Sequence, residues 1–251
     1  MTKSTNELND KVVLITGAAH RVGATMARHL HSLGMRIIVH YRHSKKAAHA
    51  LQEELNAKRE NSVVLIQADL HQSNKIKSML KEAAKTWGQL DVVINNASSF
   101  YETPVNSATD DQWDDLIGSN LRAPFFVCQN AAPFLKQANG CIINIVDIHA
   151  DRPLKNYPIY SIAKAGLVML TKSMARELGP EIRVNAIAPG AIMWPDNDID
   201  DVTKQRIISR TALKRKGEPM DIANAVRFLI DDATYMSGQV LTIDGGRTLT
   251  N

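Results

Sequence analysis

The sequence predicts an α/β protein built on one doubly wound parallel sheet of seven strands flanked by helices. Short apolar runs rich in Val and Ile alternate with stretches of helical length along the chain, which is typical of strands covered on both faces. No linker rich in Pro, Gly or Ser interrupts the series, and no internal repeat is present. Alternating strands and helices connect as right-handed βαβ units. A single domain is therefore expected.

The expected strands are seven apolar runs, in chain order Val12–Thr16, Arg36–Tyr41, Ser62–Gln67, Asp91–Asn95, Cys141–Val146, Arg183–Ala188 and Gln239–Ile243. The expected helices are Val22–Leu33, Lys45–Lys58, Asn74–Trp87, Thr109–Phe134, Pro158–Leu178 and Pro219–Ile230. Residues 1–10 are polar and are expected to form a flexible tail before a domain of residues 11–251. The polar, irregular connection 191–217 follows the end of a strand. Ligands of open α/β sheets bind beyond the carboxyl ends of the strands, so this connection is expected to be a substrate loop.

Composition and charge exclude several functional classes. The 251 residues are 44% hydrophobic and 22% charged, as in an ordinary globular protein. The net charge is +4, but the basic residues are scattered, which argues against a nucleic-acid partner. No apolar stretch is long enough to span a bilayer, and residues 1–10 lack the apolar core of a secretory signal. Cys128 and Cys141 lie in apolar runs and have no metal-ligand spacing. We expect a cytoplasmic protein with reduced, buried thiols and no metal.

A glycine turn follows the first strand, in the sequence Thr16-Gly17-Ala18-Ala19-His20-Arg21-Val22-Gly23. Unpaired amides at the start of the next helix and the positive end of its dipole form a site for an anion such as phosphate. Gly17 permits a tight turn, and Gly23 permits close packing of the helix on the strand. The pattern indicates a Rossmann-type dinucleotide site, and a purely structural turn is the alternative.

The segment after the second strand reads His40-Tyr41-Arg42-His43-Ser44 and contains no acid. An NAD-specific fold would place Asp or Glu there, on the ribose 2′-hydroxyl. Arg42 and Ser44 are suited instead to hold a 2′-phosphate through charge-assisted hydrogen bonds. NADPH is therefore the expected cofactor, and an exposed basic turn without a ligand is the alternative.

Tyr160 and Lys164 are spaced four residues apart, so on a helix their side chains share a face. An ammonium beside a phenol favours the phenolate, so Lys164 is expected to lower the pKa of Tyr160. Tyr160 would then be a usable proton donor near neutral pH.

Taken together, these motifs resemble the short-chain dehydrogenase/reductase family from Val12 to Asp244-Gly245-Gly246. The glycine turn, Asp69-Leu70, Asn95-Asn96-Ala97, Asn120, Tyr160-x-x-x-Lys164 and Pro189-Gly190 carry the resemblance. It implies that Asp69 holds the adenine, that Asn96-Ala97 lines the cofactor floor, and that Asn120 supports a proton-relay water near Lys164. It also implies that Lys164 bonds the nicotinamide ribose. The residues expected to bind cofactor are Gly17, Arg21, Val22, Gly23, Tyr41, Arg42, His43, Ser44, Asp69, Leu70, Asn96, Ala97, Ser98, Tyr160, Lys164, Pro189 and Gly190.

Three departures from the family pattern resemble one subgroup, the pteridine reductases. Arg21 replaces the third glycine of the turn, the floor motif continues as Ala97-Ser98-Ser99-Phe100, and Asp147 stands where the family has a catalytic Ser. In that subgroup the Arg contacts cofactor phosphate and pterin, the first Ser bonds the pterin, and the Phe forms one wall of its slot. The residues expected to bind substrate are Arg21, Ser98, Phe100, Asp147, Tyr160 and Trp194, and the catalytic set is Asp147, Tyr160, Lys164 and Asn120.

The chemistry of Asp147 supports that resemblance independently. A carbonyl reductase needs hydrogen-bond donors where negative charge develops on oxygen, and a carboxylate would repel that charge. Reduction of a C=N bond requires protonation of nitrogen, which a carboxylate favours. Phe100 offers a flat apolar face to a bicyclic heteroaromatic ring. The alternatives are a structural carboxylate at Asp147 and ordinary core packing for Phe100.

Two differences from the subgroup concern the far end of the substrate. Some pteridine reductases insert a basic C-terminal residue from a neighbouring subunit, whereas this chain ends in Leu249-Thr250-Asn251. After Pro189-Gly190, Ile192 replaces a small polar residue. Trp194 then either replaces part of the pterin wall or merely packs in the loop.

The expected function is therefore NADPH-dependent reduction of a C=N bond in a pterin, dihydropterin or dihydrofolate. The alternatives are a carbonyl reductase of the same family, acting on a 3-oxoacyl thioester or another ketone, and a non-catalytic nucleotide-binding relative. The resemblance also implies a homotetramer formed partly through the helices 109–134 and 158–178. Leu167, Leu170 and Met174 on the second helix suit the core and such an interface equally.

Overall fold

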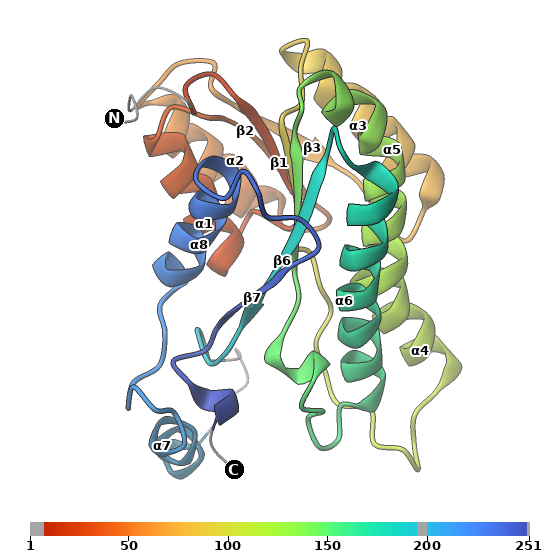
Figure 1. Cartoon of the computed structure of the whole chain (residues 1–251), viewed down its shortest axis with the longest axis vertical. Helices are drawn as coiled ribbons and strands as arrows, with labels where there is room; N and C mark the ends of the chain where they lie inside the picture. Colours follow the sequence, from red (N-terminus) through yellow and green to blue (C-terminus); the bar gives the residue numbers. More distant parts are fainter. Residues whose placement is uncertain (1–7, 195–199, 250–251) are drawn as a thin grey trace.

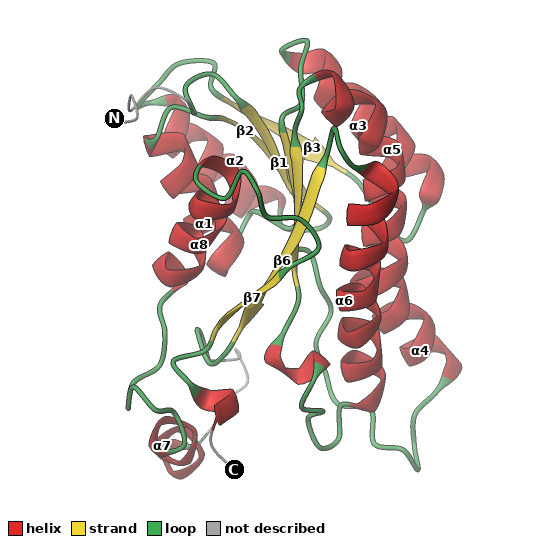
Figure 2. Ribbon diagram, viewed as in Figure 1, coloured by secondary structure: helices red, strands yellow, loops and turns green. Residues whose placement is uncertain are grey.

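The computed structural model describes residues 8–194 and 200–249. A parallel sheet of seven strands carries helices on both faces (Figure 1; Figure 2). The strands are β1 (Val12–Ile15), β2 (Arg36–Tyr41), β3 (Val63–Gln67), β4 (Val92–Asn95), β5 (Cys141–Ile145), β6 (Arg183–Pro189) and β7 (Val240–Ile243). The helices are α1 (Arg21–Ser32), α2 (Lys45–Asn56), α3 (Ser73–Thr86), α4 (Asp110–Ile117), α5 (Ala123–Gln137), α6 (Pro158–Leu178), α7 (Asp201–Ser209) and α8 (Pro219–Asp231), with shorter helical segments at Gly118–Arg122, Ile148–Ala150 and Arg247–Leu249. The predicted fold class is confirmed.

The strand order β3-β2-β1-β4-β5-β6-β7 places the first strand near the centre of the sheet. The chain winds outward from β1 to β3, then returns to β4 beside β1, where Val13 is in register with Val92. The winding direction reverses between β1 and β4, and open sheets bind ligands at such a reversal. The loops after these two strands therefore border the expected ligand crevice.

Two apolar layers fill the space between the sheet and its helices. Alternate β1 residues point to opposite faces: Val13 and Ile15 belong to the layer under α1, α2 and α8, whereas Val12 and Leu14 belong to the layer under α3, α5 and α6. Both cysteines are buried and unpaired, as predicted. Burial raises the pKa of Cys128 to about 12 and that of Cys141 to about 11, so both stay thiols.

One predicted helix is wrong in its interior. The stretch 109–134 is not continuous, because a π-helical turn at Gly118–Arg122 separates α4 from α5. Pro124 in the first turn of α5 has no amide hydrogen to donate to the preceding turn, which permits the wider turn there. Gly118 supplies the space, since a Cβ on it would lie 2.7 Å from Nδ1 of His71.

The ends of the domain differ from expectation in two places. The predicted tail of residues 1–10 is wrong at its end, because Leu8 is buried in the core and the Asp10 amide donates to the Gly34 carbonyl. Residues 1–7 lie outside the described residues. The connection 191–217, expected to be irregular, contains α7. Asp200 caps α7 by accepting a hydrogen bond from the Thr203 amide at 2.8 Å.

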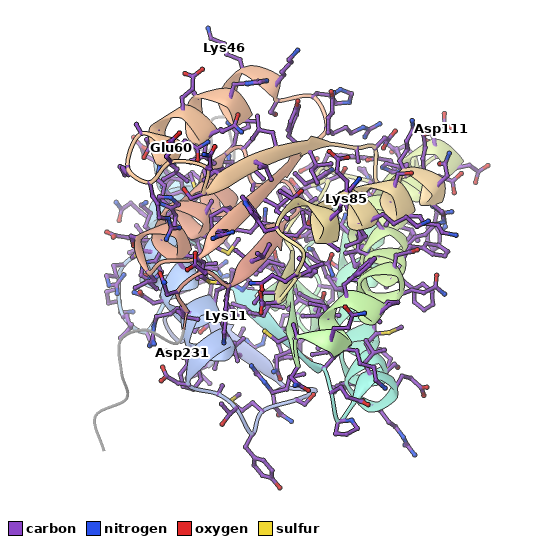
Figure 3. All side chains as sticks on the ribbon, turned by 90° about the horizontal axis from the view of Figure 1, so that it is seen from above. Lys11, Lys46, Glu60, Lys85, Asp111 and Asp231 are labelled. Carbon is purple, nitrogen blue, oxygen red and sulfur yellow. The ribbon has the colours of Figure 1, made fainter. Side chains whose placement is uncertain are left out.

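Charged side chains of both signs surround the domain, as Lys46, Glu60, Lys85 and Asp111 show in Figure 3. This distribution agrees with the scattered charge of the sequence. In the described part of the chain, no helix combines the length and apolarity needed to cross a membrane.

Candidate active site

The expected site residues gather at the carboxyl edge of the sheet, because each follows the end of a strand or starts the next helix. The glycine turn follows β1, the Asn96–Phe100 segment follows β4, Asp147 follows β5, and Pro189 ends β6. All strands are parallel, so these loops emerge on one side. The fold thereby brings together residues that lie far apart in the sequence.

The glycine turn forms a cradle that side chains would fill. Gly17 has a φ of +62°, and a Cβ there would lie 3.0 Å from the Cα of Ala97. A Cβ on Gly23 would lie 2.7 Å from the Gly17 carbonyl oxygen. Helix α1 begins at Arg21, with no side-chain cap and no acid in its first turn. The start of this helix therefore keeps the positive field that suits a phosphate. These observations fit the expected dinucleotide.

Thr16 and Asn96 hold this cradle to the end of β4. The Thr16 hydroxyl accepts hydrogen bonds from the amides of Asn96 (2.9 Å) and Ala97 (3.0 Å). The Asn96 side-chain amide donates back to the carbonyls of Thr16 (2.9 Å) and Gly17 (3.1 Å). The floor expected at Asn96-Ala97 is thus fixed directly beneath the turn.

His40 supports the same turn from β2, and the sequence had suggested no role for it. Its Nδ1 accepts a hydrogen bond from the Gly17 amide at 3.1 Å, so its Nε2 carries the proton and donates to the Ala68 carbonyl at 3.1 Å. Burial lowers the pKa of His40 to about 4, and the imidazole stays neutral. The side chain of His40 therefore links Ala68, just after β3, to the glycine turn.

The far end of the cradle carries the residues expected at the adenosine. Arg42 is exposed and pairs with Asp69, with 3.4 Å between Nε and Oδ1. Burial opposes ionisation of Asp69, but the His71 amide and Arg42 outweigh it and lower its pKa. Ser44 precedes α2 and makes no capping bond. Tyr41 and Leu70 are buried beside this end, and His43 is exposed.

Asp147 and Tyr160 are directly hydrogen-bonded in the structure. The Tyr160 hydroxyl donates to Oδ2 of Asp147 at 2.8 Å, while Oδ1 accepts the His149 amide at 2.8 Å. Tyr160 lies in the first turn of α6 (Pro158–Leu178) and is 5% exposed. The carboxylate predicted from spacing alone is thus in contact with the phenol.

The expected effect of Lys164 on Tyr160 is wrong for this arrangement. Burial, together with the charge and hydrogen bond of Asp147, raises the pKa of Tyr160 well above its ordinary value. The Lys164 ammonium donates to the Ile145 carbonyl at 3.0 Å and lies 5.6 Å from the centre of the Tyr160 ring. Burial lowers the pKa of Lys164 to about 8, although Asp147 opposes that shift. Burial, with the adjacent carboxylate second, therefore sets the ionisation of the phenol.

Asn120 lies in the π-helical turn and is completely buried. Its side-chain nitrogen donates to the carbonyls of Ser99 (2.9 Å) and Leu116 (3.0 Å). Its Oδ1 is buried without a partner among the described residues, which leaves an acceptor for a water or ligand. This geometry is compatible with the expected relay role.

An aromatic wall stands beside Asp147 and Tyr160. Phe100 is 42% exposed and stacks on Tyr157 with ring centres 4.7 Å apart and planes at 14°. The rings of Tyr160 and Phe100 form an edge-to-face pair, with their centres 4.8 Å apart. Ordinary core packing does not describe so exposed a ring. Ser98 is also exposed, and its hydroxyl makes no hydrogen bond to the described residues. Tyr157 was not predicted as a site residue, although a position three residues before Tyr160 indicates a side chain near it.

Arg21 connects the glycine turn to the connection 191–217. It has a φ of +51°, and its guanidinium donates to the Trp194 carbonyl at 2.8 Å. Trp194 is half-buried, and the loop residues 195–199 lie outside the described residues. Val22 and Gly190 complete the rim, and a Cβ on Gly190 would lie 2.7 Å from Asp244. The hydrogen bond from Arg21 thus ties the main chain of Trp194 to the glycine turn.

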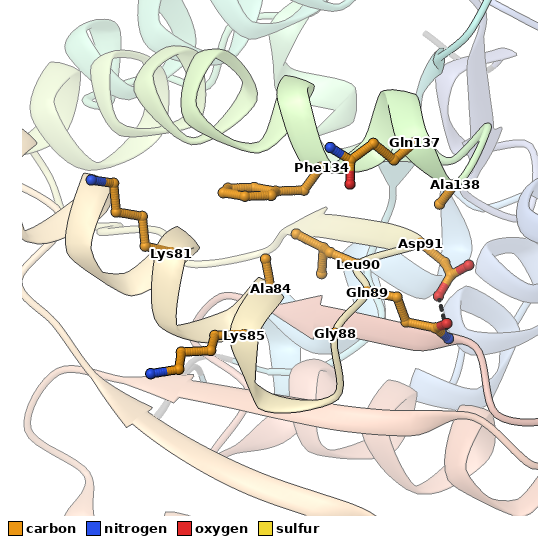
Figure 4. Close-up of a pocket in the computed structure, with 10 residues that line it drawn as sticks. All are labelled: Lys81, Ala84, Lys85, Gly88, Gln89, Leu90, Asp91, Phe134, Gln137 and Ala138. Atoms are coloured by element: carbon orange, nitrogen blue, oxygen red, sulfur yellow. Dashed lines mark hydrogen bonds between the residues drawn. The ribbon is translucent and has the colours of Figure 1, made fainter.

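A cavity of about 600 Å³ lies elsewhere, at the amino end of β4. It is bordered by α3 and the end of α5, and Lys81, Lys85 and Phe134 line it (Figure 4). Asp91 there accepts hydrogen bonds from the Val12 amide at 2.7 Å and from Gln89 at 3.2 Å. None of the expected site residues lines it. The candidate site therefore lies at the other edge of the sheet, where the expected residues gather.

Comparison with known proteins identifies the class to which this fold and site belong. A family model described as enoyl-(acyl carrier protein) reductase matches residues 17–248. The chain belongs to the short-chain dehydrogenase/reductase family and is an oxidoreductase of that family.

The similar curated proteins carry two kinds of name. A 3-oxoacyl-(acyl-carrier-protein) reductase of Staphylococcus aureus is 38% identical over 240 residues, covering 94% of this chain and 97% of the relative. Pteridine reductase 1 of Leishmania tarentolae is 33% identical over 279 residues, covering 95% and 96%. A 3-oxoacyl-(acyl-carrier-protein) reductase of Synechocystis is 32% identical over 247 residues, covering 96% and 98%. The higher identity to the Staphylococcus protein favours the carbonyl-reductase alternative, and the expected subgroup is not established.

Proposed function

We propose that this protein is an NADPH-dependent pteridine reductase acting on a C=N bond of a pterin, dihydropterin or dihydrofolate. The observation that carries the proposal is the carboxylate of Asp147, held at 2.8 Å by the hydroxyl of Tyr160. Overall identity reflects the whole scaffold, whereas substrate class depends on the few groups that face the reacting atoms. We therefore give the composition of the site more weight than the difference between 38% and 33% identity.

The charge of Asp147 distinguishes the two kinds of substrate. When a ketone is reduced, negative charge develops on oxygen, and a carboxylate in contact with the proton donor opposes it. When an imine is reduced, its nitrogen is protonated, and Asp147 stabilises the cation that then accepts the hydride at carbon. Tyr160 holds a proton beside Asp147, and Lys164 and Asn120 lie on the route by which that proton is replaced.

The wall beside these residues fits a flat heteroaromatic ring. Phe100 presents an exposed face, backed by Tyr157, which fixes the orientation of the ring. The Ser98 hydroxyl and the Arg21 guanidinium border the same crevice and are suited to the polar edge of a pterin. The Arg21 guanidinium donates to the Trp194 carbonyl, which supports a role for Trp194 on the loop side of the substrate.

The residues of the glycine turn fit NADPH, which supplies the hydride when bound. Gly17, Val22 and Gly23 provide the phosphate cradle, and Asp69 and Leu70 border the adenine. Arg42 and Ser44 stand where a 2′-phosphate is recognised, and Lys45 follows at the start of α2. Tyr160, Lys164, Pro189 and Gly190 surround the nicotinamide end.

The second candidate is a 3-oxoacyl thioester reductase, which the 38% identity to the Staphylococcus protein favours. It shares the fold, the Tyr160–Lys164 pair and the cofactor residues with the first candidate. The difference lies in Asp147, Ser98 and Phe100. Substrate preference therefore separates the two proposals.

The decisive experiment compares kcat/KM for dihydrobiopterin, dihydromonapterin, dihydrofolate, fully oxidised biopterin and an acetoacetyl thioester, with NADPH and NADH. We expect turnover of pterins with NADPH. Asp147→Ser should reduce pterin kcat/KM by about 10²- to 10⁴-fold, the usual contribution of a positioned acid–base group. Asp151→Ser, which removes an exposed carboxylate four residues away, is the matched control and should change little.

Three outcomes would contradict parts of the proposal. An unchanged pterin rate in Asp147→Ser, with high native activity on the thioester, would establish the second candidate instead. Equal use of NADH would remove the role given to Arg42 and Ser44. NADPH binding without turnover of any compound would indicate a non-catalytic relative.

We also propose that the protein is a homotetramer that associates through α5 and α6. Leu167 and Leu170 are buried and Met174 packs against the core, so these three residues do not supply the interface. Ile162 and Met169 on α6 are 50% and 61% exposed. Large apolar residues exposed on one helix are typical of a surface covered in an assembly.

A further inference from the structure

Three side chains outside the residues assigned above link two loops of the site. Asp115, on α4, contacts a side chain with each of its oxygens. Oδ1 lies 3.2 Å from Nε2 of His71, a contact that lacks hydrogen-bond geometry and becomes an ion pair when the imidazole is protonated. Oδ2 accepts a hydrogen bond from the Tyr101 hydroxyl at 3.0 Å. We call this arrangement the Asp115 bridge.

The His71 arm belongs to the turn at the nucleotide end. The His71 amide donates to Asp69 at 3.1 Å, and Asp69 pairs with Arg42. The His71 carbonyl accepts from Arg122 at 3.0 Å, and the imidazole lies against Gly118. The position of this ring is therefore fixed on two sides, and a shift of the turn would reach Asp115.

The Tyr101 arm belongs to the loop of the aromatic wall. Tyr101 directly follows Phe100, and the Asn120 side chain holds the Ser99 carbonyl at 2.9 Å. Burial and Asp115 raise the pKa of Tyr101 to about 12, so its hydroxyl keeps the proton that it donates. Two residues further, the Thr103 amide donates to the Asn156 carbonyl at 2.7 Å.

Helix α4 is a suitable rigid connection between the arms. Thr109 and Gln112 form a capping box at its start, which fixes its first turn. Leu116 is buried in a small apolar cluster with Ile159 and Tyr160. Asp115 therefore cannot move far without disturbing the helix beside the phenol.

We propose that Asp115 is a positioning residue that couples the nucleotide turn 69–71 to the loop 98–101, so that a nucleotide bound at the first orders the second. The proposal rests on the proposed function only in placing the adenosine 2′-phosphate end at Arg42 and Asp69. The occupied turn fixes the position of His71, whose imidazole contacts Asp115. Asp115 in turn accepts the hydrogen bond of Tyr101, the residue after the exposed Phe100. The aromatic wall is then formed before a substrate arrives.

The test uses 2′,5′-ADP, which carries the adenosine 2′-phosphate end and no nicotinamide. Hydrogen exchange of peptides covering 98–106 is measured with and without saturating 2′,5′-ADP, and calorimetry gives its Kd. In the wild type we expect exchange at the Thr103 amide to slow by about fivefold or more, the lower range of typical site-to-site coupling. In Asp115→Ala this slowing should be lost.

Two further variants separate coupling from simple destabilisation. Asp114→Ala removes the neighbouring exposed charge on α4 and should keep the wild-type response. Tyr101→Phe removes a single oxygen and leaves the Asp115–His71 contact in place. It should lose the response while still binding 2′,5′-ADP, with a Kd changed by no more than the coupling factor itself. A general loosening of the fold would raise exchange with and without the nucleotide alike.

An equal slowing in wild type, Asp115→Ala and Tyr101→Phe would overturn the coupling. Failure of 2′,5′-ADP to bind the wild type would overturn both the coupling and the proposed cofactor site. Because no pterin is present, a failure of the proposed pterin chemistry leaves this result unaffected, and the two proposals can fail separately.

Discussion

At the scale of single residues, Lys164 shows an opposition between stability and function. The ammonium is 3% exposed and its pKa is lowered from 10.5 to about 8. A shift of that size corresponds to a burial cost of about 3 kcal/mol for the charged form. The charge is retained beside Tyr160 at the expense of stability, as is common in active sites.

Replacing this charge should therefore stabilise the fold and abolish activity. Between about pH 8 and 10.5 the unfolded chain binds one proton more than the folded chain, so wild-type stability rises with pH across that window. Lys164→Met should gain about 1 to 3 kcal/mol at pH 7, and this gain should shrink above pH 8. Urea unfolding at pH 7 and 9 measures it. Lys172→Met, on the exposed face of α6, should show no such gain; an equal gain there would contradict the argument.

His40 predicts the same direction of response, in a window at acid pH. Its pKa falls from 6.5 to about 4 in the folded protein, so the unfolded chain binds more protons below pH 6.5. Stability should fall by about 1.4 kcal/mol per pH unit from this group as the pH drops from 6.5 towards 4. In His40→Asn, whose oxygen can still accept the Gly17 amide, the slope of unfolding free energy between pH 5 and 6.5 should decrease accordingly. The exposed His49→Asn is the control, and an unchanged slope in His40→Asn would contradict the assignment.

At the scale of elements, the π-helical turn between α4 and α5 sets the position of Asn120. The wider turn separates Asn120 from the regular ladder of hydrogen bonds, and its side chain reaches back to Ser99 and Leu116. Gly118 is needed at the start of this turn because the His71 ring occupies the space of a Cβ. The element therefore depends on a contact from a distant loop.

Gly118→Ala should displace this turn and lower kcat by about tenfold or more, since small misplacements of catalytic groups have large effects. Steady-state kinetics and thermal unfolding together provide the measurement. Thr109→Ala, which breaks the capping box of α4, should cost about 1 kcal/mol and leave kcat nearly unchanged. If both variants lost stability alone, the turn would have no special role in positioning Asn120.

Sequence patterns predicted most elements because each depends mainly on its own residues. The apolar runs of β1 to β7 and the amphipathic α1 and α8 are local signals. Pro124 was a local signal for the break after α4 and was not used. The contact between Gly118 and His71 joins distant parts of the chain, and no periodicity reports it. Similarly, α7 has no buried residue among those described, so it shows no apolar face to recognise.

At the scale of the whole molecule, α5 and α6 lie with α3 on one side of the sheet (Figure 1). Ile162 and Met169 leave apolar surface on this layer.

A buried Glu at the centre of a subunit contact would carry an unpaired charge, which costs several kcal/mol. Met169→Glu should therefore convert the proposed tetramer into smaller species in analytical ultracentrifugation. Val105→Glu, at a residue 85% exposed in the loop before α4, should not, and an identical mass for all three proteins would contradict the proposed interface.

The candidate site was predictable to the extent that its residues occur in fixed spacings. Tyr160 and Lys164 share a helix, and Asp147 stands at a set distance before them. Their hydrogen bonds depend on the three-dimensional arrangement, and so the raised pKa of Tyr160 was not foreseen. His40 and Asp115 were missed for the same reason, because their partners lie on other strands and loops.

The support that His40 gives the glycine turn has a consequence for protein engineering. A strand, a glycine turn and a helix are often treated as a portable unit that can be moved between scaffolds. Here the amide of Gly17 is held by a side chain from the neighbouring strand, which is itself anchored at Ala68. The smallest transplantable unit is therefore three adjacent strands with their connections, and a graft of residues 12–32 alone would carry the glycines without the histidine that holds them in place.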